Sequence, residues 1–165
     1  MVFFVKVAGA SLADGTLVGY LAKALEASRL QGDSLVLEIT ERDAVNHLKD
    51  AKTFTEGLKQ LHCRCALTQF GSSLKPFNLL KHLEVAFLKF DVSLVKNLSS
   101  DQKAKEQLQS YVDTAHSLGK LTIAECVEEA STMATLWHCG INYIQGNFIQ
   151  PPSPELSFDF SNNEG

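Results

Sequence analysis

Short apolar runs separated by amphipathic stretches are the feature that most constrains how this chain can fold. Six runs have the length of a β-strand, at residues 3–7, 34–40, 65–70, 86–90, 121–126 and 143–148. Helical periodicity fills most of the stretches between them, and little irregular sequence is left over. Because the runs are apolar on both faces, they predict a parallel sheet covered by helices, which is an α/β fold.

The expected helices are marked by apolar residues at helical spacing and by residues that favour helix ends. Leu17, Leu21 and Leu25 define the first helix, and residues 43–62 form another, with a break expected near Asp50. A short helix with Phe77, Leu80 and Leu83 follows a turn at Gly71-Ser72-Ser73. The next helix begins at Ser99-Ser100-Asp101, carries Leu108, Tyr111, Val112 and Ala115 on one face, and stops at Gly119. The last helix covers residues 129–139, with Gly140 as its C-cap.

Polar residues collect where the apolar runs end. Glu38, Lys89, Glu125 and Gln145 each close a run, whereas the third run ends on the neutral pair Thr68-Gln69. Periodicity alone leaves an open doubly wound sheet and a barrel as alternatives, and no Gly-x-Gly-x-x-Gly follows a strand to favour the first. A (β/α)₈ TIM-type barrel carries its chemistry at the carboxyl ends of its strands. The polar strand ends therefore favour an incomplete barrel of about six βα units.

Composition excludes several classes of protein. The net charge is −4 and no basic block is present, which argues against a DNA- or RNA-binding surface. The opening Met1-Val2-Phe3-Phe4-Val5 is interrupted by Lys6, and no apolar run has the length of a membrane-spanning helix, so no membrane insertion is expected. Cys63, Cys65, Cys126 and Cys139 lie in or beside apolar segments, which predicts reduced thiols in a cytoplasmic protein.

Charged residues inside apolar strands are the strongest candidates for a functional cleft. Glu38 and Lys89 would be costly in a core, so we predict that they face a site. Glu125 and Glu128 fit a site too, but acids at the start of a helical segment also interact favourably with the helix dipole. Phe148 fits a core position and a stacking position equally well.

Four motifs together resemble the EAL domain family. They are Leu37-Glu38-Ile39-Thr40-Glu41, Lys89-Phe90-Asp91, Ala124-Glu125-Cys126-Val127-Glu128 and Gln145-Gly146-Asn147-Phe148, in the family's order and spacing. The family has a (β/α)₈ barrel and hydrolyses or binds cyclic di-GMP. The resemblance predicts a partial EAL domain at residues 1–160 that lacks the first strands, followed by a frayed tail at 161–165.

The resemblance assigns roles to individual residues. It implies that Glu38 and Glu125 are metal-ligand positions, that Lys89 is the lysine that helps to activate water, and that Glu128 and Gln145, with Gly146 and Phe148, line the ligand site. Pro152 matches a proline that packs against a guanine base. Two departures stand out: the family's paired aspartates fall on Thr68 and Gln69, and its metal-binding asparagine falls on Lys6. Cys126 replaces a usual glycine.

These departures predict a receptor and not an enzyme. Cleavage of a phosphodiester by two metal ions needs several anionic oxygen ligands, and Thr68 and Gln69 supply only neutral groups. We expect no metal cofactor, and we expect Lys6 to pair with Glu38 or Glu125. Other segments, such as Tyr143-Ile144-Gln145-Gly146 and the ending Ser157-Phe158-Asp159-Phe160, resemble the degenerate EAL domains of FimX-type proteins. That group binds cyclic di-GMP in type IV pilus twitching motility and contacts a PilZ-domain adaptor.

Two other functions stay open from the sequence. A residual phosphodiesterase requires that other ligands rebuild the metal site. An interaction module without nucleotide binding is the second alternative, because an incomplete barrel exposes strand edges and apolar surface.

Overall fold

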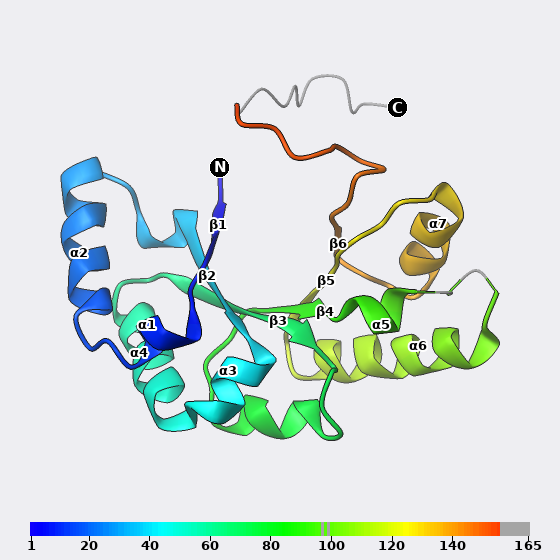
Figure 1. Cartoon of the computed structure of the whole chain (residues 1–165), viewed down its shortest axis with the longest axis horizontal. Coiled ribbons are helices and arrows are strands. Elements are labelled where there is room, and N and C mark those ends of the chain that lie inside the picture. The colour runs from blue at the N-terminus through cyan, green and yellow to red at the C-terminus, as the bar shows by residue number, and fades with distance from the viewer. Residues whose placement is uncertain (97, 99, 156–165) are drawn as a thin grey trace.

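Six parallel strands form a single curled sheet, a half-barrel, in the computed structural model, which describes residues 1–96, 98 and 100–155. Their order across the sheet is their order along the chain (Figure 1). The strands are β1 (Phe3–Lys6), β2 (Leu35–Thr40), β3 (Arg64–Phe70), β4 (Phe87–Phe90), β5 (Leu121–Ala124) and β6 (Tyr143–Ile144). This arrangement confirms the predicted incomplete barrel of six units.

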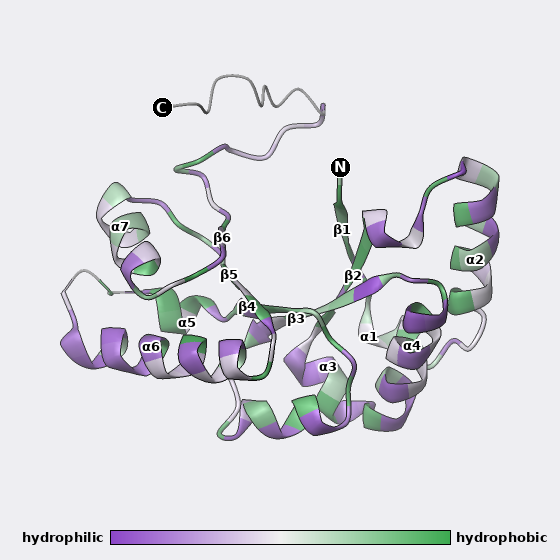
Figure 2. Cartoon of the chain, turned by 180° about the vertical axis from the view of Figure 1, so that it is seen from behind, coloured by the Kyte–Doolittle hydropathy of each residue, from purple (hydrophilic) through white to green (hydrophobic). Residues whose placement is uncertain are grey.

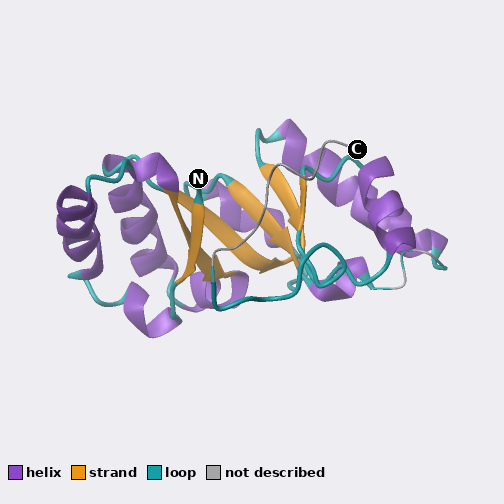
Figure 3. Cartoon of the chain, turned by 90° about the horizontal axis from the view of Figure 1, so that it is seen from above, coloured by secondary structure: helices purple, strands orange, loops and turns teal. Residues whose placement is uncertain are grey.

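Helices cover the outer side of the curled sheet and leave its inner side open (Figure 3). The α-helices are α1 (Gly9–Leu12), α2 (Leu17–Ser28), α3 (Glu41–Asn46), α4 (Leu48–Gln60), α5 (Val92–Val95), α6 (Gln102–Ser117) and α7 (Ala130–His138). Two short 3₁₀ helices, η1 (Gly32–Ser34) and η2 (Pro76–Lys81), complete the connections.

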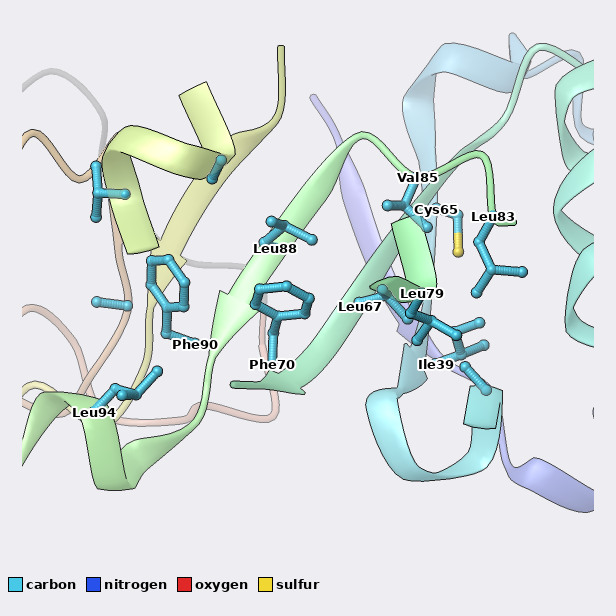
Figure 4. Close-up of a cluster of buried hydrophobic side chains, with 14 of the residues drawn as sticks. Ile39, Cys65, Leu67, Phe70, Leu79, Leu83, Val85, Leu88, Phe90 and Leu94 are labelled. Atoms are coloured by element: carbon cyan, nitrogen blue, oxygen red, sulfur yellow. The ribbon is translucent and has the colours of Figure 1, made fainter. Parts of the chain in front are cut away.

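The main core lies between the sheet and these helices. Figure 4 shows part of it, where Phe70, Leu88 and Phe90 project from adjacent strands. Tyr111 of α6 packs against Phe90, with ring centroids 6.4 Å apart. The helices accordingly turn apolar residues toward the sheet and polar residues outward (Figure 2). Alternation along each strand then sends the residues between these core positions to the inner face.

Several predicted boundaries need correction. The helix expected from Asp43 begins at Glu41, because Thr40 caps α3 by accepting from the Asp43 amide at 3.0 Å. The break expected near Asp50 lies at His47, whose φ of −126° and ψ of 44° are not helical. Asp101 is confirmed as the N-cap of α6, with its carboxylate accepting from the amides of Lys103 and Ala104. Ser99 and the tail 161–165 lie outside the described residues.

The last two strands are shorter than predicted, for a steric reason. Strand β5 ends at Ala124, so Glu125 and Glu128 lie in the loop before α7 and not in a helix. Strand β6 ends at Ile144, because the chain turns at Gly146 against the backbone of Val127. A Cβ on Gly146 would lie 2.1 Å from the Val127 carbonyl oxygen, so only glycine fits there.

The outermost strands, β1 and β6, each have one neighbour in the sheet. On the inner face near them, Phe4 and Tyr143 are about half exposed. Among the described residues, every helix is too short or too polar to cross a bilayer.

Candidate functional site

An ion-paired triad on the inner face is the centre of the candidate site. Lys89 of β4 places its Nζ 2.6 Å from Oε1 of Glu38, on β2, and 2.7 Å from Oε1 of Glu125, just after β5. These three residues, the Lys89 triad, come from strand ends that the curl of the sheet brings together. The structure therefore unites three of the residues that the sequence predicts for the site.

The triad is largely removed from solvent. Glu38 and Lys89 are each 3% exposed, whereas a quarter of the Glu125 side chain is exposed. A buried charge is tolerated when it is paired and hydrogen-bonded, and each carboxylate here meets the same ammonium. The triad is therefore most accessible to solvent at Glu125.

Two opposing effects act on the pKa of Lys89. Burial is the larger single effect and lowers the pKa, because it disfavours the charged ammonium. Hydrogen bonds to Glu125 and Glu38, with their negative charges, together outweigh burial and raise the pKa above its usual value of 10.5. Lys89 is therefore a permanent cation at neutral pH.

The predicted pairing of Lys6 is wrong. Lys6 lies opposite Glu38 in the register of β1 and β2, but its side chain is exposed. Among the described residues it forms no ion pair within 4 Å, because Lys89 already engages both carboxylates. Lys6 thus supplies an accessible positive charge at the rim of the triad.

The end of β3 carries the neutral pair that the sequence singled out. Thr68 is buried and Gln69 is exposed, and Gln69 has a positive φ of 53° one residue before the end of β3. The pairing with β4 shifts its register between Leu67 and Phe70, which is typical of a β-bulge. The regular alternation of side chains along β3 is therefore interrupted at Gln69.

Glu41 organises the loop after β3 and was not identified from the sequence. Its carboxylate is 1% exposed and accepts from the Gly71 amide at 2.7 Å, from the Ser72 amide and from the Ser73 hydroxyl. Its position in the first turn of α3 suggests only a partner for the helix dipole. Two sequence features together could have identified this role. Glu41 is the second acid of the Leu37–Glu41 motif, and the next βα unit contains the Gly71-Ser72-Ser73 turn, whose amides and hydroxyl need an acceptor.

A polar cavity of about 230 Å³ lies between the loops that follow β4 and β5. Its lining includes Lys96, Cys126 and Glu128, so the predicted residue Glu128 faces a cavity. Cys126 has a φ of 58°, a conformation that glycine adopts without strain. This backbone requirement accounts for the glycine that the EAL resemblance leads one to expect here.

The remaining predicted residues lie on or after β6. Gln145 and Lys89 line a second cavity, of about 250 Å³, on the inner face. Gly146 holds the turn against Val127, and the Phe148 amide donates to the Val127 carbonyl at 3.1 Å. Phe148 is 46% exposed and Pro152 is exposed, so neither is a core residue. Of the two positions that the sequence left open for Phe148, the core position is therefore excluded.

The described residues contain no cluster of three or more acidic, histidine or cysteine side chains able to hold a metal ion. The two acids of the Lys89 triad, Glu38 and Glu125, are both bonded to Lys89. The side chains of the described residues therefore do not form a donor set that fits a metal ion.

The fold and site define a class: a TIM-barrel-type α/β domain with acids and a lysine at its strand ends. The sequence matches the EAL domain family over residues 1–152. The chain therefore belongs to the EAL domain family. It is 31% identical over 154 residues to the cyclic di-GMP phosphodiesterase PdeB of Shewanella oneidensis, covering 93% of this chain and 18% of PdeB.

Solved EAL domains share the structure closely. The FimX EAL domain of Pseudomonas aeruginosa bound to c-di-GMP is 46% identical, with a TM-score of 0.93 over 96% of this chain and 65% of that one. The Xanthomonas citri FimX EAL domain in complex with c-diGMP is 29% identical, with a TM-score of 0.92 over 97% of this chain and 63% of that one. The chain thus spans less than a fifth of PdeB and about two thirds of these structures.

Replacing Lys89 with methionine should strongly destabilise the protein. The Lys89→Met variant leaves Glu38 buried without its cation, which costs about 3–5 kcal/mol in the free energy of unfolding at pH 7. Urea denaturation measures the loss. The double variant Lys89→Met/Glu38→Gln should recover most of it, whereas Lys23→Met, at an exposed position on α2, serves as the control.

The same comparison has a pH dependence. Since the pKa of Lys89 is raised in the folded state, its contribution to stability is complete below pH 10.5 and is lost as the pH rises through the folded-state pKa. The advantage of the wild type over Lys89→Met should therefore shrink above pH 10.5. An advantage that stays constant there would show that the ammonium is not held by the two acids.

Proposed function

We propose that this chain binds cyclic di-GMP (c-di-GMP) without hydrolysing it and acts as a receptor in bacterial signalling. The single observation that carries the proposal is that the end of β3 offers only the neutral side chains of Thr68 and Gln69 at the positions that match the family's paired aspartates. Hydrolysis by two metal ions needs several anionic oxygen ligands, and the two carboxylates that remain, Glu38 and Glu125, share the Lys89 ammonium.

The neighbouring strand ends support the loss of hydrolysis. Two catalytic metal ions lie about 3.5–4 Å apart and share several anionic oxygen ligands. Thr68 and Gln69, which match the paired aspartates of the family, offer neutral oxygens, and Lys6 adds a positive charge opposite Glu38. Each of these substitutions lowers the affinity of the strand ends for divalent cations.

The same residues suit an anionic nucleotide. The Lys89 triad has a net charge of −1, and the accessible ammonium of Lys6 brings the local sum to zero. We infer that Lys6 meets a phosphate oxygen, while Glu128 and Gln145, in their two cavities, reach polar edges of the ligand. Phe148 and Pro152 are exposed and available to pack against a guanine base.

The similarity to FimX EAL domains supports a ligand of this kind. Two of those structures contain c-di-GMP and superpose on nearly all of this chain. The resemblance also predicts a PilZ-domain adaptor and a link to type IV pilus twitching motility, and both stay predictions.

Binding should not require metal, and the ligand should remain intact. We expect calorimetric titration with c-di-GMP to give the same affinity before and after exhaustive treatment with EDTA. Chromatography after incubation with Mg²⁺ or Mn²⁺ should show no linear pGpG. The Glu38 and Glu125 carboxylates, held by Lys89, supply no metal site for the attacking water.

Each alternative function has its own outcome in this experiment. Binding that vanishes on chelation would show that a metal is still held at the site, and accumulation of linear pGpG would establish a residual phosphodiesterase. An interaction module would show neither heat of binding nor an increase in the melting temperature, which tight binding raises by mass action.

Removal of the Lys6 charge should weaken binding. A hydrogen bond to a charged group contributes about 1.5–3 kcal/mol, so Lys6→Ala should lower the c-di-GMP affinity by about tenfold or more. It should also reduce the dependence of affinity on salt concentration, measured by calorimetry over a range of NaCl. Lys23→Ala is the matched control; an equal loss in both variants would refute the role of Lys6.

A further inference from the structure

An aromatic row crosses the inner face below the Lys89 triad. Phe4 of β1 and Phe87 of β4 make an edge contact with ring centroids 5.3 Å apart, and Tyr143 of β6 lies 6.2 Å from Phe87. All three rings line the inner cavity of about 250 Å³. Strands β1 and β4 are separated by two others in the sheet, so this contact exists only because the sheet is curled.

Two of the three rings, those of Phe4 and Phe87, have a cation over their face. The Lys89 Nζ lies over the ring of Phe4, 5.7 Å from its centroid. Arg64 lies over the ring of Phe87 at 5.2 Å and donates to the Asp33 carbonyl at 2.8 Å. An ammonium within about 6 Å of a ring centroid is attracted by the negative face of the ring.

Phe4 approaches Lys89 from a direction that the two acids do not cover. Glu38 reaches the ammonium from β2 and Glu125 from the loop after β5, whereas Phe4 extends from β1. Lys89 is 3% exposed although it faces a cavity where Phe4 itself is 41% exposed. The ring therefore lies between the ammonium and the open part of the inner face.

We propose that Phe4 is a positioning residue, whose ring holds the Lys89 ammonium between Glu38 and Glu125. The role in ligand binding rests on the function proposed above: with Lys89 fixed, the exposed side of Glu125 and the Lys6 ammonium keep a constant arrangement toward a phosphodiester. Without the ring, Lys89 can move toward the cavity, and the two carboxylates lose their shared cation for part of the time.

The direct test is the pKa of Lys89 in the protein without nucleotide, followed by NMR of its ¹⁵Nζ and ¹³Cε nuclei. The ring stabilises the charged form, so Phe4→Leu should lower this pKa by about 0.4–0.7 pH units. The charged groups around Lys89 are Glu38 on β2, Glu125 after β5, Lys6 on β1 and Arg64 on β3, and all are unchanged in the variant.

Matched variants separate positioning from packing. Tyr143→Leu removes a ring of the same row that carries no cation, and it should leave the pKa of Lys89 unchanged. Phe4→Tyr keeps an aromatic face, so the pKa of Lys89 in this variant should equal the wild-type pKa. The proposal would be overturned if the pKa of Lys89 shifted equally in Phe4→Leu and Tyr143→Leu, or if Phe4→Tyr lowered it as much as Phe4→Leu does.

A second measurement avoids any loss of folding. Replacement of Phe4 by 3,4,5-trifluorophenylalanine keeps the size of the ring but withdraws electron density from its face. The pKa of Lys89 should fall as with leucine, and the affinity for c-di-GMP should fall about two- to fivefold. An unchanged pKa would overturn the positioning role. A lowered pKa in a protein that does not bind c-di-GMP would instead support the positioning role and refute the proposed ligand.

Discussion

The ion pairs of Lys89 with Glu38 and Glu125 are the interaction on which the account of this site depends. Glu38 on β2 lies 51 residues before Lys89 on β4, and Glu125, just after β5, lies 36 residues after it. The ion pairs therefore join three parts of the chain that are far apart in the sequence. Taking one partner away leaves a buried charge, so the three residues stabilise the site only as a set. The charge of Lys89 also offsets part of the negative charge that Glu38 and Glu125 place at the strand ends.

The curled parallel sheet makes this arrangement possible. In a flat sheet, Phe4 and Phe87 would be separated by the width of two intervening strands, and here their rings are in contact. The helices hold the curl from outside through the core around Phe70 and Phe90. The inner face is consequently free to carry charged and aromatic residues, which pair with one another across the concave side.

The sequence predicts the six units and their order because apolar runs and helical periodicity are local signals. It also identifies Glu38, Lys89 and Glu125, since charges inside apolar strands are costly without a site. It does not decide which lysine binds the acids: Lys6 and Lys89 both face inward, and only the curl of the sheet selects Lys89. Glu41 was missed for a similar reason, because its partners Gly71, Ser72 and Ser73 belong to the next unit.

The central claim is that these strand ends, with the neutral Thr68 and Gln69 beside the Lys89 triad, do not hold the metal ions that hydrolysis needs. Electron paramagnetic resonance of Mn²⁺, titrated into the protein with saturating c-di-GMP, tests it most directly. The account predicts that the signal of free Mn²⁺ rises from the first addition as it does in buffer with the nucleotide alone. Stoichiometric disappearance of that signal, at one or two equivalents per chain, would contradict it.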